Sequence, residues 1–382
     1  MTPTAPHPDQ RALVELLRAA PLVDGHNDLL WQLRLQAAYD LDRIDIAAPC
    51  PTLHTDLPRL RAGGLGAQFW SVYVPSDLPG HEAVTATLEQ LDGFHRLLAR
   101  YPGDLGFAGT ADEVDRVARS GRIASMAGIE GGHSIGGSLG VLRMMHALGA
   151  RYMTLTHNHT TSWADSATDV ERHGGLTAFG VQVVHEMNRL GMLVDLSHVA
   201  PATMWAALAA TRAPVLFSHS SARALCDHPR NVPDDVLAQL AVNGGVCMVT
   251  FVPPFVSPPI AAARLELAAL ERAWLAHHGG DAEAVAALSA RWRAEHPVPR
   301  ATLAQVADHV DHVREVAGTE HVGIGGDFDG VDELPEGLAD VSAYPALFAE
   351  LRRRGWQDDE LRALAGGNLL RVLRDAEQVA AG

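Results

Sequence analysis

Residues 22–28 read LVDGHND, a short apolar segment that ends in a His-x-Asp pair, His26 and Asp28. Side chains two residues apart in a strand lie on the same face, so both polar groups share one face of a predicted buried strand. A buried charge is costly unless a partner compensates it. We therefore expect a compensating group, such as a metal ion, where this strand ends.

Seven further apolar segments follow along the chain, and each precedes a stretch whose apolar residues have helical spacing. The eight predicted strands are residues 22–28, 67–74, 123–131, 152–158, 192–198, 214–220, 245–251 and 321–330. Alternation of buried strands and amphipathic helices predicts parallel strands joined by right-handed crossovers. Eight such units favour an α/β fold of the (β/α)8, or TIM barrel, type. A doubly wound open sheet is the alternative.

The chain has 382 residues, a length that barrels of this kind often use as one domain. We predict a single catalytic domain over residues 1–382. The longest interruption of the strand–helix alternation lies at 257–300, which is rich in alanine and leucine and has helical spacing. We predict that it is a helical insertion after the seventh strand.

The net charge, the terminal sequence and the cysteines indicate which partners and which cell compartment to expect. The formal net charge is −16, which argues against nucleic acid or an anionic membrane as partner. The N-terminus lacks a basic region followed by an apolar one, and no run of 18 apolar residues occurs, so we expect neither a signal peptide nor a membrane span. Cys50, Cys226 and Cys247 lack CxxC spacing and are typical of reduced thiols in a cytoplasmic protein.

All 30 basic residues are arginine, and the chain contains no lysine. This excludes Schiff-base chemistry, a P-loop lysine and a carbamylated lysine that bridges two metal ions. The 20 histidines remain as the main nitrogen ligands and bases.

Side chains that can bind a metal or exchange a proton end six of the eight predicted strands. They are His26 with Asp28, Glu130, His157, His198, His219 and Asp327. In barrel enzymes the chemistry lies at the C-terminal ends of the strands. One such histidine alone is more often a hydrogen-bonded core residue, but six coincident strand ends favour a site for Zn²⁺ or a similar divalent ion.

The set contains enough ligands for two ions. His26 and Asp28 can supply one site, and His198 and His219 the other. Because no lysine is present, Glu130 is the candidate bridge between them. Paired ions of this kind hold a bridging hydroxide that acts as the nucleophile.

Four aspartates near the strand ends are assigned different roles. We expect Asp327 to accept the proton of the attacking water and pass it to a leaving amine. Asp329 precedes a glycine and is typical of a turn or helix cap. Asp195 faces away from His198 by strand periodicity and is interpreted as structural. Asp24 shares the face of His26 but lies deeper in the strand, and is left out of the site.

Nine segments together resemble the membrane (renal) dipeptidase family, a metal-dependent branch of the amidohydrolase superfamily. They are LVDGHNDL, AGIEGGHSI, YMTLTHN, LVDLSHV, PVLFSHSSARAL, RNVPDDVL, QVADHVDHVREVAG, VGIGGDFDGV and GGNLLRVL. The resemblance runs in the same order from about residue 21 to residue 375. It is weakest near 257–300.

The resemblance implies a (β/α)8 barrel that binds two zinc ions and hydrolyses free dipeptides, including those with a D-residue at the C-terminal position. The implied ligands are His26, Asp28, Glu130 as bridge, His198 and His219. His157 is similar to the histidine that polarises the scissile carbonyl and stabilises the oxyanion. Arg230 is similar to the arginine that binds the substrate carboxylate, for which a planar guanidinium is well suited. Asp327 matches the catalytic aspartate.

The resemblance also implies a homodimer, whereas the secretion and lipid anchoring of animal relatives are not carried over, because no signal peptide or apolar tail is seen. His133 and His159 are interpreted as residues outside the metal site. The segment VTFVPPFV at 249–256 either lines the pocket or belongs to the core.

Three alternatives remain open. Residues 132–136, GHSIG, fit the G-x-S-x-G pattern of a serine hydrolase with Ser134 as nucleophile. That reading leaves the other strand ends unexplained. Another dinuclear amidohydrolase, such as a lactonase or phosphotriesterase, usually needs the bridging lysine that is absent here. A metal-binding protein with a degenerate site is disfavoured by the presence of His157, Arg230 and Asp327 together.

Overall fold

Eight parallel strands close into a barrel in this computed structural model, which describes residues 13, 16–17 and 20–382. In chain order they are β1 (Leu22–Asn27), β2 (Leu65–Tyr73), β4 (Ile123–Glu130), β5 (Ala150–Thr154), β6 (Leu193–Asp195), β7 (Leu216–Phe217), β8 (Val246–Val249) and β9 (Val322–Ile324). Each strand pairs with the next, and β9 pairs with β1. The predicted barrel is confirmed, and the doubly wound alternative is wrong.

One strand was not predicted. The strand β3 (Leu105–Phe107) pairs with the first residues of β4, on the edge that β5 occupies further along. It is three residues long and contains a glycine, so neither an apolar run nor an alternation marks it. It adds a short ninth strand outside the closed barrel.

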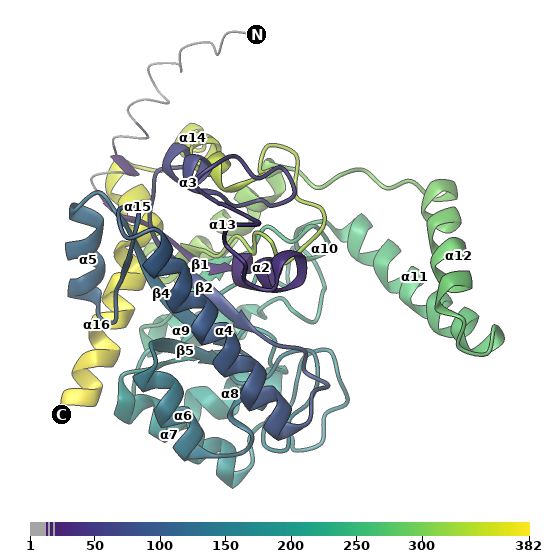
Figure 1. Cartoon of the computed structure of the whole chain (residues 1–382), viewed down its shortest axis with the longest axis horizontal. Coiled ribbons are helices and arrows are strands. Elements are labelled where there is room, and N and C mark those ends of the chain that lie inside the picture. Colours follow the sequence, from purple (N-terminus) through teal and green to yellow (C-terminus); the bar gives the residue numbers. More distant parts are fainter. Residues whose placement is uncertain (1–12, 14–15, 18–19) are drawn as a thin grey trace, which may run out of the picture.

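Helices surround the barrel (Figure 1). They are α2 (Leu29–Ala37), α3 (Leu57–Ala62), α4 (Gly80–Arg100), α5 (Ala111–Arg119), α6 (Leu139–Ala147), α7 (Ala178–Leu190), α8 (Pro201–Ala210), α9 (Asp234–Asn243), α13 (Leu303–Ala317), α14 (Tyr344–Arg353), α15 (Asp358–Arg362) and α16 (Asn368–Ala381). Hydroxyl side chains of Thr110, Ser138 and Thr177 accept hydrogen bonds from the first turns of α5, α6 and α7. These caps fix where the helices begin. No helix in the described ranges is long and apolar enough to cross a membrane.

A helical segment follows β8, the seventh barrel strand, as predicted. It comprises α10 (Pro253–Val256), α11 (Pro258–His277) and α12 (Ala282–Glu295). Figure 1 shows α11 and α12 standing away from the barrel. Few of their side chains are buried: Ile260, Ala261 and Leu267 in α11, and Ser289 in α12. That residues 1–382 form one domain stays a prediction.

Several predicted strands extend too far at their C-terminal ends. The structure ends β6 at Asp195, β7 at Phe217 and β9 at Ile324, so the polar residues after them lie in loops. His198 and Asp327 have left-handed backbones, with φ of 68° and 60°. This conformation cannot continue a strand, and it is strained for residues other than glycine.

Candidate metal centre

The eight predicted site residues lie together at the C-terminal end of the barrel. Seven of them line a cavity of about 440 Å³, and His26 is buried next to two of these seven, Asp28 and Glu130. These seven are Asp28, Glu130, His157, His198, His219, Arg230 and Asp327. Six strands and the loops after them therefore deliver chemically active groups to one pocket, as barrel geometry predicts.

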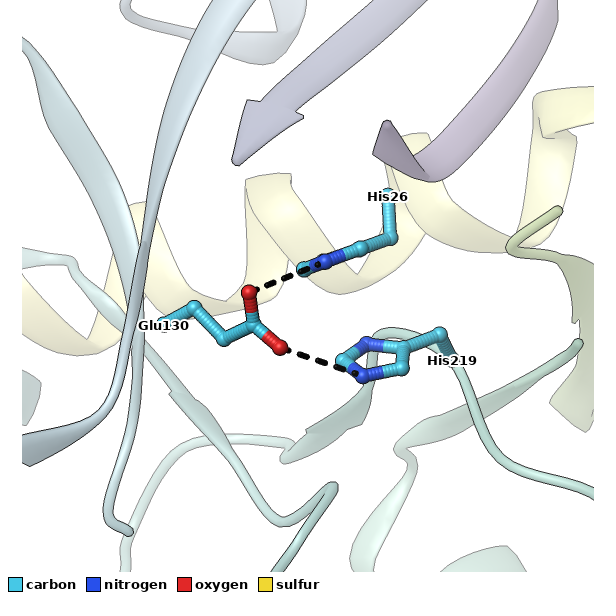
Figure 2. A group of neighbouring side chains, drawn as sticks. All are labelled: His26, Glu130 and His219. Carbon is cyan, nitrogen blue, oxygen red and sulfur yellow. Dashed lines mark ion pairs between the residues drawn. The ribbon is translucent and has the colours of Figure 1, made fainter. Parts of the chain in front are cut away.

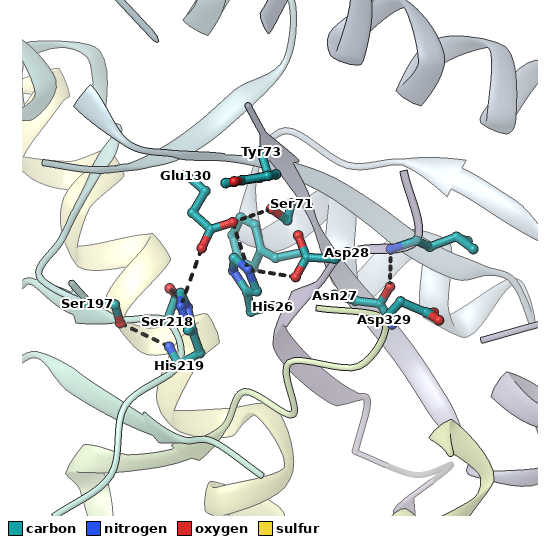
Figure 3. Close-up of polar contacts among 12 residues, drawn as sticks. His26, Asn27, Asp28, Ser71, Tyr73, Glu130, Ser197, Ser218, His219 and Asp329 are labelled. Carbon is teal, nitrogen blue, oxygen red and sulfur yellow. Dashed lines mark hydrogen bonds and ion pairs between the residues drawn. The ribbon is translucent and has the colours of Figure 1, made fainter. Parts of the chain in front are cut away.

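The His26–Asp28 pair lies at the C-terminal end of β1. His26 is the fifth residue of β1, and Asp28 follows the strand and begins α2. His26 Nε2 lies 3.3 Å from Asp28 Oδ2 (Figure 3). His26 Nε2 is buried and has no hydrogen-bond partner among the described residues, so a ligand-competent nitrogen lies next to this carboxylate.

Glu130, the last residue of β4, faces several histidines, and Figure 2 shows each of its two oxygens paired with a different one, His26 or His219. Its Oε2 is 3.4 Å from His26 Nε2. Its Oε1 is 3.0 Å from His198 Nε2 and 3.7 Å from His219 Nε2. His157 Nε2 lies 3.5 Å from the same Oε1. The two oxygens of one carboxylate thus face two different sets of nitrogen donors.

The charges of these groups depend on one another. Burial alone would raise the pKa of Glu130, but His26, His198 and His157 hold it well below its usual value. Burial lowers the pKa of His198 and of His219 well below the usual range. Both imidazoles are therefore neutral near pH 7, which is the form that binds a metal.

The donor atoms fit a divalent metal ion. Three groups of side chains have ligand atoms within 4.8 Å of one another: His26 with Glu130 and His219, Glu130 with His157 and His198, and His26 with Asp28 and Asp327. Imidazole nitrogen and carboxylate oxygen are the ligands that zinc and similar ions take from proteins. Glu130 is shared between the first two groups.

Asp327 lies in the loop after β9, and its side chain is next to that of Asp28. Burial raises the pKa of Asp327 well above its usual value, and the negative charges of Asp28 and Glu130 add to this. Gly330 makes the close approach possible. A Cβ there would lie 2.3 Å from Asp327 Oδ1 and 2.4 Å from Asp28 Oδ2, so any larger residue would displace a carboxylate.

Arg230 lines the other side of the cavity and is only 4% exposed. Its Nη2 donates to the carbonyl oxygen of His219 at 3.4 Å, while its Nη1 is buried without a partner in the part of the chain that the structure describes. Burial lowers the pKa of Arg230 to about 10, so the guanidinium stays charged at neutral pH. Its planar face lies over the ring of Phe255, 5.2 Å from the centroid. An unpaired buried donor of this kind is suited to an incoming carboxylate.

His157 packs between Tyr73 and His198, one of the candidate metal ligands. Its ring centroid is 4.9 Å from that of Tyr73 and 4.4 Å from that of His198. Ser166 Oγ donates to its carbonyl oxygen at 2.6 Å and fixes the loop that carries it. Burial lowers the pKa of His157 to about 4, so its ring is neutral in this setting.

The other polar residues near the strand ends are structural. Asp329 Oδ1 accepts from the backbone of His54 at 2.6 Å, which ties a neighbouring loop to the one after β9. Asp24 accepts four hydrogen bonds, from the backbones of His26 and Gly326 and the side chains of Gln68 and Tyr344. It therefore joins β1 to the loop that carries Asp327 and is not free to bind a ligand.

The candidate serine nucleophile does not have a catalytic setting. Ser134 is buried, and its Oγ has no hydrogen-bond partner in the described part of the chain. His133 bonds to the carbonyl oxygen of Val74, and His159 bonds to Ser76. Without a base at its hydroxyl, Ser134 cannot be activated as a serine-hydrolase nucleophile.

Sequence reasoning missed several residues around the site. Trp31, Tyr73 and His228 line the cavity, and so do Val252 and Phe255 from the segment 249–256. When an aromatic residue lies inside an apolar run, the sequence does not show whether its side chain lines a pocket or packs in the core. Only the position of Val252 and Phe255 after a barrel strand indicated a role in the pocket.

The sequence matches the model of one protein family over residues 10–382, and that family is described as membrane dipeptidase (peptidase family M19). Dipeptidase 3 of Rattus norvegicus is 42% identical over 369 residues, which cover 95% of this chain and 67% of that protein. Dipeptidase verJ of Clonostachys rogersoniana is 42% identical over 377 residues, covering 96% of this chain and 87% of that protein.

A solved structure agrees with these sequence matches. It is a metallopeptidase from Rhodobacter sphaeroides, liganded with a phosphinate mimic of the dipeptide L-Ala-D-Ala. It is 26% identical, with a TM-score of 0.77, and the match covers 94% of this chain and 99% of the other.

Proposed function

This chain belongs to the membrane dipeptidase family, peptidase family M19, and is a metal-dependent dipeptidase; from that premise we propose that it uses two zinc ions to hydrolyse free dipeptides, including L,D-dipeptides. The observation that carries the proposal is the position of Glu130, whose Oε2 faces His26 and whose Oε1 faces His198 and His219. A phosphinate mimic of an L,D-dipeptide bound to the Rhodobacter sphaeroides protein supports the stereochemical part.

The proposed ligands divide into two sets that share Glu130. His26 and Asp28 would hold one ion, and His198 and His219 the other. When bound, such a pair of ions supplies a nucleophilic water at neutral pH and polarises the scissile carbonyl. The rest of the chemistry belongs to the protein's own side chains.

Arg230 would orient the substrate. Its unpartnered Nη1 lines the cavity and can pair with the C-terminal carboxylate of a dipeptide. The cavity of about 440 Å³ is of the size that takes a small molecule. Phe255 and His228 lie beside Arg230 and would contact the side chain of the C-terminal residue.

His157 and Asp327 would act on the reacting atoms. His157 Nε2 faces the centre of the site and can donate a hydrogen bond to the oxygen of the scissile carbonyl as negative charge develops there. Asp327 can hold a proton at a carboxylate oxygen because its pKa is raised. It would take that proton from water and deliver it to the leaving amine.

A panel of L,L- and L,D-dipeptides, assayed on protein of known metal content, tests the proposal. We expect hydrolysis to stop when a chelator removes the metal and to return in full after two equivalents of Zn²⁺ per chain. Full recovery with one equivalent would contradict the dinuclear site. Turnover of lactones or phosphotriesters with no turnover of dipeptides would identify the other class of amidohydrolase.

A further inference from the structure

Two buried chains of hydrogen bonds lie behind the histidines of the metal centre. The first involves Tyr152, which is fully buried in β5. Its hydroxyl oxygen lies 2.8 Å from His26 Nδ1 and donates to the carbonyl oxygen of Gly25 at 3.2 Å. A carbonyl can only accept, and a phenol has one hydrogen. When that hydrogen goes to Gly25, His26 Nδ1 must be the donor to Tyr152.

The second chain lies behind His219 and ends in a carboxylate. Ser218 Oγ lies 2.8 Å from His219 Nδ1 and donates to Asp195 Oδ2 at 2.6 Å. An ionised carboxylate only accepts, so the single hydroxyl hydrogen of Ser218 points to Asp195. His219 Nδ1 must then donate to Ser218. Figure 3 shows Ser218 and His219 next to each other at this side of the centre.

Both hydrogen-bond chains have the same effect on Nε2, the ring nitrogen on the far side of each histidine. With the hydrogen on Nδ1, the neutral imidazole has its lone pair on Nε2. In His26 this Nε2 faces Asp28 and Glu130. In His219 it faces Glu130 and lies 2.9 Å from His198 Nε2, from which it can accept a hydrogen bond. His198 lacks such support, because its Nδ1 is buried and no residue of the described ranges bonds to it.

The barrel makes room for the first chain. Gly128 in β4 faces the Tyr152 ring, and a Cβ at this glycine would lie 2.0 Å from Tyr152 Cζ. The ring also packs against Phe69, with 4.8 Å between centroids. These contacts hold the Tyr152 hydroxyl in place next to His26. Tyrosine is the only residue type that carries a hydroxyl at the end of a ring of this size.

We propose that Tyr152 and the Ser218–Asp195 pair are positioning residues that fix the Nδ1–H tautomer of His26 and His219 and so present the bare Nε2 of each histidine to a divalent metal ion. The inference rests on the proposed function, because it requires these histidines to be metal ligands. Groups that orient metal-binding histidines in this way commonly change metal affinity by about 10–100-fold when they are removed.

Zn²⁺ binding to the metal-free full chain, measured by competition with a chromophoric chelator, tests the proposal without any assay of activity. Tyr152→Phe and Ser218→Ala keep the packing and remove one hydroxyl each. We expect each to weaken the binding of one ion by about 10–100-fold. Tyr101→Phe and Ser125→Ala remove buried hydroxyls that bond to Asp45 and Ile123, outside the metal centre, and should bind both ions as the parent does.

Asp195→Asn gives a sharper test, because it should reverse the direction of the hydrogen bond between Ser218 and His219. The Asp195 Oδ1 accepts from the backbones of Ser197 and Ser218, and Oδ2 accepts from the hydroxyls of Thr154 and Ser218. In asparagine the amide oxygen keeps the backbone bonds, and the NH₂ group faces the hydroxyls. The Ser218 hydroxyl must then donate its hydrogen to His219 Nδ1. A neutral His219 that accepts at Nδ1 carries its own hydrogen on Nε2, where it blocks metal binding.

If the tautomer of His219 decides Zn²⁺ affinity, the variants should follow an order that loss of packing alone would not produce. Asp195→Asn should weaken Zn²⁺ binding more than Ser218→Ala, although Ser218→Ala removes the group that touches His219. Equal affinity of the parent, Tyr152→Phe and Ser218→Ala would overturn the proposal. So would an Asp195→Asn protein that binds Zn²⁺ as well as Ser218→Ala does, provided that thermal unfolding shows both to be folded. If Asp195→Asn does not fold, the Zn²⁺ affinities of Tyr152→Phe and Ser218→Ala decide whether the proposal holds.

Failure of this inference is distinguishable from failure of the proposed function. A parent chain that binds no Zn²⁺ would overturn the metal centre itself, and this inference with it. A parent that binds two ions tightly, alongside hydroxyl variants that do the same, would leave the metal centre in place and remove only the positioning role.

Discussion

Two carboxylates of the site have different surroundings and therefore different proposed tasks. Glu130 is surrounded by histidines, which hold its pKa well below the usual value and keep it ionised. Asp327 is buried next to Asp28, and its pKa is raised well above the usual value. When environments separate the pKa values of neighbouring acids in this way, one can act as a ligand and the other can carry a proton.

Replacement of Asp327 by asparagine tests the second of these tasks. We expect Asp327→Asn to lower kcat for dipeptides by roughly 10²–10⁴-fold, because asparagine cannot carry the proton from water to the leaving amine. Metal content, measured on the same preparation, should stay at the parent value. Asp332→Asn, which changes an exposed aspartate of the same loop, is the matched control. Near-parental turnover in Asp327→Asn would exclude the proton-transfer role.

Replacement of Arg230 tests recognition of the substrate carboxylate. Arg230→Met should lower kcat/KM for free dipeptides by about 100-fold, since a buried charge-assisted pair is lost. The parent and variant should differ little on dipeptide amides, which lack the carboxylate. Steady-state kinetics with matched pairs of acid and amide substrates measure both effects. An equal loss on both substrates would show that Arg230 acts on something other than the carboxylate.

At the scale of elements, α13 is held to the loop after β7 by a histidine that must remain neutral. His309 is 1% exposed, and its Nδ1 accepts from the backbone N–H of Ala222 at 3.1 Å. Burial lowers the pKa of His309 to about 4. An unfolded chain has an ordinary histidine pKa of about 6.5. The folded state therefore binds fewer protons than the unfolded state between these two values.

This difference predicts a loss of stability on acidification. The contribution of His309 is fully present above about pH 6.5 and is lost as the pH falls toward 4, by at most about 3 kcal/mol. His309→Asn keeps an acceptor near the Nδ1 position and does not titrate. Urea unfolding of parent and variant at pH 7 and pH 4.5 measures the effect. We expect the variant to lose less stability than the parent over this range, and equal losses would contradict the assignment.

The elements also show what the sequence could and could not predict. All eight barrel strands were found because each is an apolar run followed by a helix pattern, and the His26–Asp28 pair followed from strand periodicity. The ends of β6 and β9 were predicted too late, since nothing in the sequence marks the left-handed backbones of His198 and Asp327. Tyr152 was missed because its contact with His26 joins residues 126 positions apart.

For the whole molecule, metal removal should reduce stability. Glu130, Asp28 and Asp327 bring carboxylates together in a buried site, and a bound cation would compensate them. An ion that binds only the folded chain stabilises it by about 4 kcal/mol at 1,000 times its Kd. We expect the Tm to fall on chelation and to return with Zn²⁺. An unchanged Tm would contradict tight binding at this site. The homodimer and the cytoplasmic location stay predictions.

The role of Asp24 has a consequence for the order in which the protein can be made. This side chain bonds to the backbone of Gly326 and the hydroxyl of Tyr344, which lie 302 and 320 residues later in the chain. During synthesis, β1 therefore leaves the ribosome long before these two partners of Asp24 exist, although β2 follows early and can pair with one edge of β1. The other edge of β1 stays open until β9 has been translated, so the candidate site around His26 and Asp28 can be completed only late in synthesis.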